Sequence, residues 1–211
     1  KKVNSDIIEI HNRPSYVDEI FKSTKAKIVL YFHNDPLEMS GSKSVKERRD
    51  IINKTEKIIF NSEWSKKRFI KNLNGINQKS NKLQVIYQSV ERAKVNISKK
   101  KNIITFVGKL NRAKGYDIFG KAILKILDKY PNWKSNVFGD EPREKWIFKH
   151  KNLTIKGFKP HAEVLKNFRE SSITVVCSRW EEPFGRTSLE ASSRGCAVII
   201  SNRGGLPETV S

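Results

Sequence analysis

Cysteine, methionine and long apolar runs are all scarce in this sequence of 211 residues. Cys177 and Cys196 are its only cysteines, and each lies in or beside an apolar run without forming a C-x-x-C pair. This pattern indicates buried thiols in a reducing compartment, and it excludes a disulfide framework and a cysteine-based zinc site. No apolar run approaches the roughly 18 residues that mark a membrane-spanning helix, so we predict none.

The chain also lacks the usual motifs for dinucleotides, P-loop phosphates and metal ions. It contains neither G-x-G-x-x-G nor G-x-x-x-x-G-K-S/T, which excludes the common dinucleotide fingerprint and the P-loop. It has no D-x-D triplet, and no group of His and Asp residues has the spacing of metal ligands. We therefore expect neither a metal nor another cofactor.

Acidic residues are few compared with basic ones. The chain has 42 Lys and Arg residues and 22 Asp and Glu residues, which gives a net charge of +20. The lysines are scattered, as in the run 99–101, and are mixed with many asparagines. Three interpretations stay open: a composition bias on a solvated surface, a patch facing an anionic membrane, or a nucleic-acid-binding surface. Aromatic residues are not interleaved with the basic clusters, which counts against specific nucleic-acid binding.

The ends of the chain indicate a fragment of a longer protein. Residue 1 is Lys, and Met39 is the only methionine. The chain stops at Ser211, just after Leu206-Pro207-Glu208, where a helix is expected to begin.

Short continuous apolar runs alternate with segments of helical periodicity. This pattern predicts an α/β protein with parallel sheets covered by helices on both faces. The predicted strands are 6–10, 27–32, 57–60, 83–87, 103–107, 135–138, 153–155, 173–177 and 197–200. The predicted helices are 15–21, 44–54, 63–72, 115–130, 143–149, 161–169 and 184–194. The polar stretch 89–101 reads as a linker, which gives one domain over 1–88 and a second over 102–211.

Glycine and lysine residues follow the predicted strand 103–107. Gly108 lets the backbone approach a ligand closely, while Lys109 and Lys114 offer two ammonium groups before a helix that begins near Gly115. Oriented N–H groups at that helix start add to the attraction for a diphosphate. The structural alternative is a tight turn with solvated lysines.

Two carboxylates, Glu182 and Glu190, flank a predicted turn from strand into helix. Carboxylates accept hydrogen bonds from pairs of hydroxyl groups, so one can hold a sugar and the other a ribose. The backbone amides of Phe184, Gly185 and Arg186 at the helix start can meet the phosphates between them. The alternative is that Glu182 only stabilises the helix start and that Glu190 is a solvated surface residue.

The segment from Glu182 to Glu208 resembles the E-x7-E signature of the family 4 retaining glycosyltransferases. The resemblance rests on Glu182-Pro183-Phe184-Gly185, Glu190-Ala191, Gly195 to Ile199 and Gly204-Gly205-Leu206-Pro207-Glu208. The segment from Val107 to Gly115 is similar to that family's phosphate loop, and Val85 to Val90 resembles the entry to its C-terminal domain. The resemblance implies the GT-B fold, with two Rossmann-like domains that are both incomplete in this chain.

The resemblance also implies roles for individual residues. Glu190 would bind the ribose of the donor, Glu182 would contact the transferred sugar, and Lys109 and Lys114 would neutralise the leaving diphosphate. His33, after the strand 27–32, would lie near the donor phosphate and the reacting centre. Lys109 stands where the family usually has Arg, which keeps the charge but loses bidentate geometry.

Other polar residues receive weaker interpretations. A lone His after a strand is often a turn or core residue, so this alternative stays open for His33. His11 occupies a similar strand end and can line an acceptor cleft, and the segment 139–142 can approach the nucleobase. We expect His150 and His161 to be surface residues.

These observations predict an enzyme that transfers a sugar from a nucleotide-diphosphate sugar to a glycan or lipid-linked acceptor with retention of configuration. The expected setting is cell-envelope polysaccharide or lipopolysaccharide synthesis in the cytoplasm, with peripheral attachment to the inner face of the cell membrane as an open alternative. Two alternatives stay open: a non-catalytic sugar-nucleotide binder and a basic nucleic-acid-binding protein.

Overall fold

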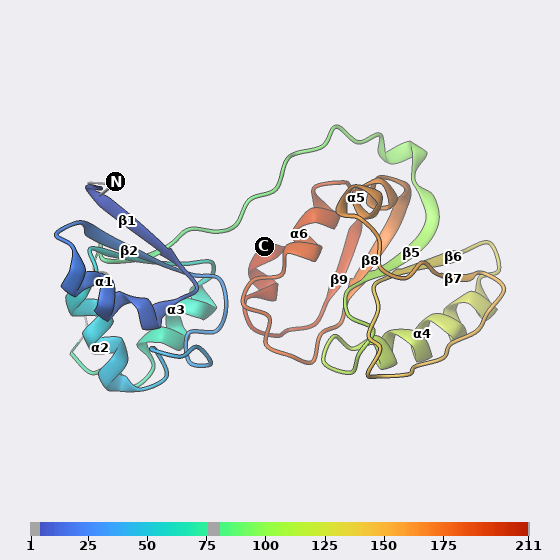
Figure 1. The fold of residues 1–211 in the computed structure, drawn as a ribbon. Helices are drawn as coiled ribbons and strands as arrows, with labels where there is room; N and C mark the ends of the chain where they lie inside the picture. Colours follow the sequence, from blue (N-terminus) through green and yellow to red (C-terminus); the bar gives the residue numbers. More distant parts are fainter. Residues whose placement is uncertain (1–4, 76–80, 211) are drawn as a thin grey trace. The chain divides into compact units, whose positions relative to one another are not determined.

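The computed structural model describes residues 5–75 and 81–210. The chain divides into two compact units, Lys1–Gln88 and Ser89–Ser211, and each is described by itself. Both units are built on parallel sheets with helices between the strands (Figure 1). The predicted α/β class is therefore confirmed.

The first unit contains a four-stranded parallel sheet of order β1-β2-β3-β4. Its strands are β1 (Ile7–His11), β2 (Lys27–Phe32), β3 (Lys57–Phe60) and β4 (Leu83–Val85). Its helices are α1 (Val17–Ser23), α2 (Val45–Lys54) and α3 (Glu63–Ile70), with a 3-10 turn at Pro14–Tyr16.

One face of this first sheet carries the core. Along β2, Ile28, Leu30 and Phe32 are buried, while the alternate residues are more exposed. All three helices contribute to the same apolar cluster, through residues such as Val17 and Ile51, and Figure 1 shows them on one side of the sheet. The expectation of helices on both faces is therefore wrong for the described part of this unit.

Two of its helices begin at serine caps. The Ser44 side chain accepts a hydrogen bond from the Glu47 amide, and the Glu47 carboxylate accepts one from the Ser44 amide. This reciprocal capping box satisfies two amides that the helix leaves unpaired. Ser62 caps α3 by accepting from the Ser65 amide.

The second unit contains a five-stranded parallel sheet of order β7-β6-β5-β8-β9. Its strands are β5 (Lys101–Val107), β6 (Lys134–Phe138), β7 (Leu153–Ile155), β8 (Ser171–Val176) and β9 (Ala197–Ile200). Its helices are α4 (Tyr116–Lys129), α5 (His161–Glu170) and α6 (Arg186–Ser192), with 3-10 turns at Ile97–Lys99 and Leu206–Thr209.

This second sheet is covered on both faces (Figure 1). Phe119 and Ile123 of α4 pack with Phe106 of β5 in one cluster. Phe168 of α5 and Ala191 of α6 pack with Phe138 in another. The central strand β5 is thus buried between two apolar layers, which explains its continuous apolar run.

The predicted helix over 143–149 is absent, because this segment is irregular in the structure. Trp146 and Phe148 both pack on the cluster around α4, a spacing of two that suits extended backbone rather than helix. Gly120 makes room for this packing, since a Cβ there would lie 2.0 Å from the Phe148 ring. The strands predicted over 27–32, 57–60, 153–155 and 197–200 occur with these ends, and the other predicted elements occur with shifted ends. The helix predicted over 184–194 shortens to Arg186–Ser192.

The end of the predicted linker is fixed to the second unit by Lys100. Its ammonium group donates hydrogen bonds to the carbonyl oxygens of Phe168, Ser171 and Arg194 at 2.7, 2.8 and 2.6 Å. Burial lowers the pKa of this amine. Within the described residues, no helix is both long and apolar enough to cross a membrane.

Candidate functional site

The carboxyl ends of β5 and β6 lie close together because two glycines follow them. The Gly108 amide donates to the Phe138 carbonyl at 3.0 Å. Gly139 has a φ of +130°, and a Cβ there would lie 1.9 Å from the Gly108 carbonyl oxygen. Only glycine allows this approach, which leaves open space beside the strand ends.

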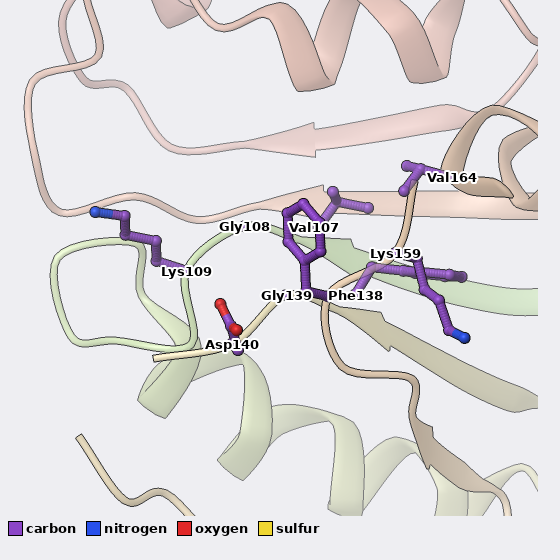
Figure 2. Close-up of a pocket in the computed structure, with 9 residues that line it drawn as sticks. Val107, Gly108, Lys109, Phe138, Gly139, Asp140, Lys159 and Val164 are labelled. Atoms are coloured by element: carbon purple, nitrogen blue, oxygen red, sulfur yellow. The ribbon is translucent and has the colours of Figure 1, made fainter. Parts of the chain in front are cut away.

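A first cavity of about 260 Å³, here called the glycine cavity, lies beside this contact. Figure 2 shows Lys109 and Lys159 on opposite sides of the Gly108–Gly139 contact, with Asp140 near the loop. Phe158 also lines the cavity and is 76% exposed, so one aromatic face is open to a ligand. The remaining lining residues are Val107, Phe138 and Val164.

The loop from Lys109 to Gly115 is held against the end of β8. Gly115 has a φ of +73°, and a Cβ there would lie 2.0 Å from the Cys177 carbonyl oxygen. The Lys114 amide donates to the Asn111 side chain at 2.9 Å. This packing brings the Lys114 ammonium to the Glu182 carboxylate, 2.5 Å from Oε1.

A second cavity of about 140 Å³, here called the Lys114 cavity, is lined by residues from both loops. The lining residues are Phe106, Val107, Gly108, Lys114, Val176, Ser178, Glu182, Gly185, Arg186 and Thr187. Five predicted site residues therefore line one cavity. Lys109 lines the glycine cavity instead, and Val107 and Gly108 line both.

Glu182 is fixed on several sides. Its carboxylate accepts from the Ser178 hydroxyl as well as from Lys114. Its carbonyl accepts from the Gly205 amide at 2.7 Å, which ties the Gly-Gly turn to this loop. The Lys114 ammonium also lies 5.3 Å from the centre of the Trp180 ring, a cation–π distance.

A second ion pair joins the same two loops. The Arg179 guanidinium donates to both oxygens of Asp117, in the first turn of α4, at 2.7 and 2.9 Å. The amides of Arg179 and Trp180 both donate to the Ala113 carbonyl. Burial raises the pKa of the Asp117 carboxyl, but hydrogen bonds and charge from Arg179 outweigh burial and leave that pKa below its ordinary value.

Glu190 lies on α6 and is only 9% exposed, so it is not a solvated surface residue. Its Oε1 lies 3.2 Å from the Arg186 guanidinium and 3.1 Å from His161 Nε2. His161 is exposed, but its contact with Glu190 was not predicted from the sequence. His150 is mostly buried and receives a hydrogen bond from the Asn152 amide, so the prediction of a surface residue is wrong there.

Helix α6 begins at Arg186, two residues later than predicted. Phe184 is buried, so its ring belongs to the core and only its backbone can face a ligand. Gly185 is the N-cap with a φ of +112°, and the helix that follows has seven residues. A role for the amides of Phe184, Gly185 and Arg186 in phosphate binding stays a prediction.

His33 follows β2 in the first unit and is held there by neighbours. Its Nε2 lies 3.0 Å from His11 Nδ1, and its Nδ1 lies 3.3 Å from the Gln88 side-chain nitrogen. Its amide and carbonyl bond to the side chains of Asn12 and Asn61. Burial, and secondarily the charge of His11, lower the pKa of the His33 ring.

Sequence reasoning missed three contributors to this geometry: the Arg179–Asp117 pair, Ser178 and His161. The Arg179–Asp117 pair and His161 involve residues distant in sequence, so no local pattern marks them. Ser178 lies four positions before Glu182, but a single serine at that spacing carries no signal of its own. Across residues 5–75 and 81–210, no group of three or more His, Cys, Asp or Glu side chains could hold a metal ion. The expected independence from metals stays a prediction.

Comparisons with known proteins identify a family and a shared fold. Residues 88–211 match the family model described as glycosyl transferases group 1. Spore coat protein SA of Bacillus subtilis (strain 168) is 25% identical over all of this chain and 63% of that protein. An uncharacterized 41.2 kDa protein in the cps region of Klebsiella pneumoniae is 27% identical over 98% of this chain and 63% of its own length.

Solved structures share the fold. The structure of Anabaena Alr3699/HepE in complex with UDP-glucose aligns with a TM-score of 0.70 at 19% identity. It covers 98% of this chain, which spans 62% of that protein. The chain thus spans somewhat less than two thirds of the length of these relatives. The expected two-domain GT-B architecture is confirmed at the level of the fold.

Proposed function

The chain belongs to the group 1 glycosyl transferases, and we propose that it is the part of such an enzyme that binds a nucleotide-diphosphate sugar. The whole protein would transfer the sugar to a glycan or lipid-linked acceptor, in cell-envelope polysaccharide or lipopolysaccharide synthesis. The observation that carries this proposal is the Lys114 cavity, where Gly108, Lys114, Glu182 and Arg186 converge at the carboxyl ends of parallel strands.

Charge on the leaving group governs the proposed chemistry. When the bond from the sugar to the diphosphate breaks, negative charge grows on the phosphate oxygens. The Lys114 ammonium group has three N–H donors. Among the described residues, its contact with Glu182 uses one of these donors. We propose that the others stabilise the leaving diphosphate, with Lys109 adding charge from the next cavity.

Each part of the donor has a proposed place. The glycine cavity would take the nucleobase, with Phe158 as an aromatic wall and the segment after Gly139 at its edge. Glu190 would accept hydrogen bonds from the ribose hydroxyls, and Glu182 would face the transferred sugar. A role for His33 in the reaction stays part of the proposal and rests on the resemblance.

Retention of configuration belongs to the same proposal and rests on the resemblance of the Glu182–Glu190 segment to retaining enzymes. The test is the anomeric configuration of the product, measured by NMR immediately after transfer in the whole protein. An inverted product would refute this part and leave donor binding intact. Activity that disappears with a chelator would refute the proposed metal independence.

A non-catalytic sugar-nucleotide binder uses the same pockets, so turnover is needed to separate it from an enzyme. The whole protein would be screened by thermal shift against UDP, GDP and ADP sugars, because a ligand of the native state raises the melting temperature. Transfer assays with the best donor follow. Stabilisation without transfer or donor hydrolysis would favour the binder, and no stabilisation by any donor would refute the site.

The net charge of +20 supports a second part of the proposal, peripheral contact with anionic lipid. Each Lys or Arg near such a surface contributes about 1 kcal/mol. Sedimentation with vesicles that contain or lack phosphatidylserine tests it. Equal binding to both vesicle types would contradict membrane attraction by charge, and tight, salt-dependent binding to random DNA would favour a nucleic-acid-binding surface instead.

A further inference from the structure

The histidine pair of the first unit forms a directed chain of contacts. His11 ends β1 and His33 follows the neighbouring strand β2, so both rings lie at the same edge of the sheet. The His11 ring stacks on Tyr31 with centroids 4.4 Å apart and is nearly parallel to the His33 ring at 5.3 Å. Stacking therefore fixes the ring planes while the nitrogens face each other.

The direction of this chain follows from its end groups. The Gln88 side-chain nitrogen can only donate, so His33 Nδ1, 3.3 Å away, must accept. A neutral His33 then carries its proton on Nε2 and donates it to His11 Nδ1 at 3.0 Å. His11 in turn carries its proton on Nε2, which faces the Glu9 carboxylate at 3.5 Å.

We propose that His11 is a positioning residue for His33: together with Gln88 and Glu9, it holds His33 neutral, with the proton on Nε2 and the lone pair on Nδ1. Both ring nitrogens of His33 are engaged, so a ligand must take the place of the Gln88 amide. That ligand must itself donate a hydrogen bond, as a sugar hydroxyl does. Unprotonated phosphate oxygens only accept, and this tautomer offers them nothing at Nδ1.

The surroundings support a neutral ring. Burial lowers the pKa of His33, and the neighbouring imidazole of His11 adds to this effect. The titratable groups recorded around the pair are Glu9 and Tyr31, and burial together with Glu9 raises the pKa of the Tyr31 hydroxyl. Glu9 is half-exposed, so its contact stabilises the His11 tautomer only weakly.

The test reads the tautomers directly by nitrogen-15 NMR of the histidine rings in the whole protein. Replacing His11 and His33 one at a time assigns their ring signals, whatever other histidines the protein contains. The expected spectrum at neutral pH shows His33 with a protonated Nε2 and an unprotonated Nδ1. A protonated Nδ1, or an imidazolium ring, would overturn the proposal.

Matched variants separate positioning from packing. His11→Phe keeps a ring on Tyr31 but removes the acceptor of the His33 Nε2 proton, so only Gln88 still favours this tautomer and the Nδ1-protonated form should become detectable. His11→Asn keeps an acceptor oxygen and should preserve that tautomer, although it loses the stack. Gln88→Glu replaces the donor with an acceptor and should move the proton to Nδ1. An unchanged His33 spectrum in His11→Phe and Gln88→Glu would refute the proposed series of hydrogen bonds from Gln88 through His33 to His11.

The consequence for turnover rests on the proposed function and is measured separately. In the whole protein, His11→Phe should lower kcat about tenfold, as losing the partner of a functional histidine does. The KM for the donor should stay nearly unchanged. His11→Asn should have a kcat close to that of the wild type. Equal kcat in all three proteins would remove the positioning role. If the predicted tautomer is present but no transfer occurs with any donor, the proposed function fails while the histidine chain stands.

Discussion

The two units carry opposite chemistry at the carboxyl ends of their parallel strands. In the second unit this edge is charged, with Lys114 and Arg186 beside Glu182 and Glu190. In the first unit His33 is held by the His11 ring and by the neutral side chains of Asn12, Asn61 and Gln88. A charged edge suits a diphosphate, whereas a neutral hydrogen-bonding edge suits hydroxyl groups.

The largest effect should come from removing charge at the second edge. In the whole protein, Lys114→Ala should lower kcat by about 10²–10³, the usual cost of losing one donor to developing negative charge. Lys121→Ala removes the same charge from an exposed position on α4 and is the matched control. Similar turnover in the two variants would show that Lys114 has no special role.

Nucleotide binding should depend on Glu190 to a smaller extent. Glu190→Gln should weaken binding of the best nucleotide about 10- to 100-fold, the cost of one hydrogen bond to a charged group. The loss should shrink for the 2′-deoxynucleotide, because the ribose partner is already missing. Glu163→Gln on α5 is the control, since this side chain is half-exposed. An equal loss with both nucleotides would argue against ribose binding.

Stability of the second unit should depend on pH through Asp117. Asp117→Asn should lower its unfolding free energy at pH 7 by about 1–3 kcal/mol, below the usual cost of breaking a buried pair because Arg179 is partly exposed. The folded pKa of Asp117 lies below its ordinary value, so this stability is present above the unfolded pKa, about 4. It is lost as the pH falls through the folded pKa.

Urea unfolding from pH 7 down to pH 3 measures this effect. The wild-type protein should lose stability over that range more steeply than Asp117→Asn, while Asp50→Asn, an exposed position on α2, should behave like wild type. Parallel curves for all three proteins would mean that the Arg179 contact contributes nothing.

The smallest expected effect lies in the first unit. Ser44→Ala should lower its unfolding free energy by about 1 kcal/mol, since it removes the side-chain half of the capping box. Ser44→Asp keeps an acceptor at the N-cap and should restore most of the loss. If Ser44→Ala unfolds at the wild-type urea concentration, the cap is not needed in this context.

Local signals in the sequence predicted most of the fold. The apolar runs of β2 and β5 act over a few residues, and the structure confirms both strands. The segment 143–149 is predicted as a helix from its sequence. Among its charged residues, the spacing of two between Trp146 and Phe148 is easily overlooked. Only the space at Gly120, distant in sequence, shows why the extended form is preferred.

The candidate site was predictable where backbone and charge coincide. Gly108, Lys114, Glu182 and Gly185 were identified from their positions after strands, and the structure places them around one cavity. The contact of His161 with Glu190 joins the start of α5 to the interior of α6 and leaves no mark in either segment. Lys100 was assigned to a linker because its three carbonyl partners lie about 70 to 95 positions away in the chain.

Titration of UDP, GDP and ADP into the whole protein by calorimetry tests the central claim most directly, with Lys114→Ala and Lys121→Ala measured in parallel. The charged edge of the second unit predicts that one nucleotide binds at a single site. Lys114→Ala should weaken the binding of this nucleotide about tenfold or more, as expected for a charge-assisted hydrogen bond. Lys121→Ala should leave the affinity unchanged. Failure of all three nucleotides to bind, or equal affinity in both variants, would contradict it.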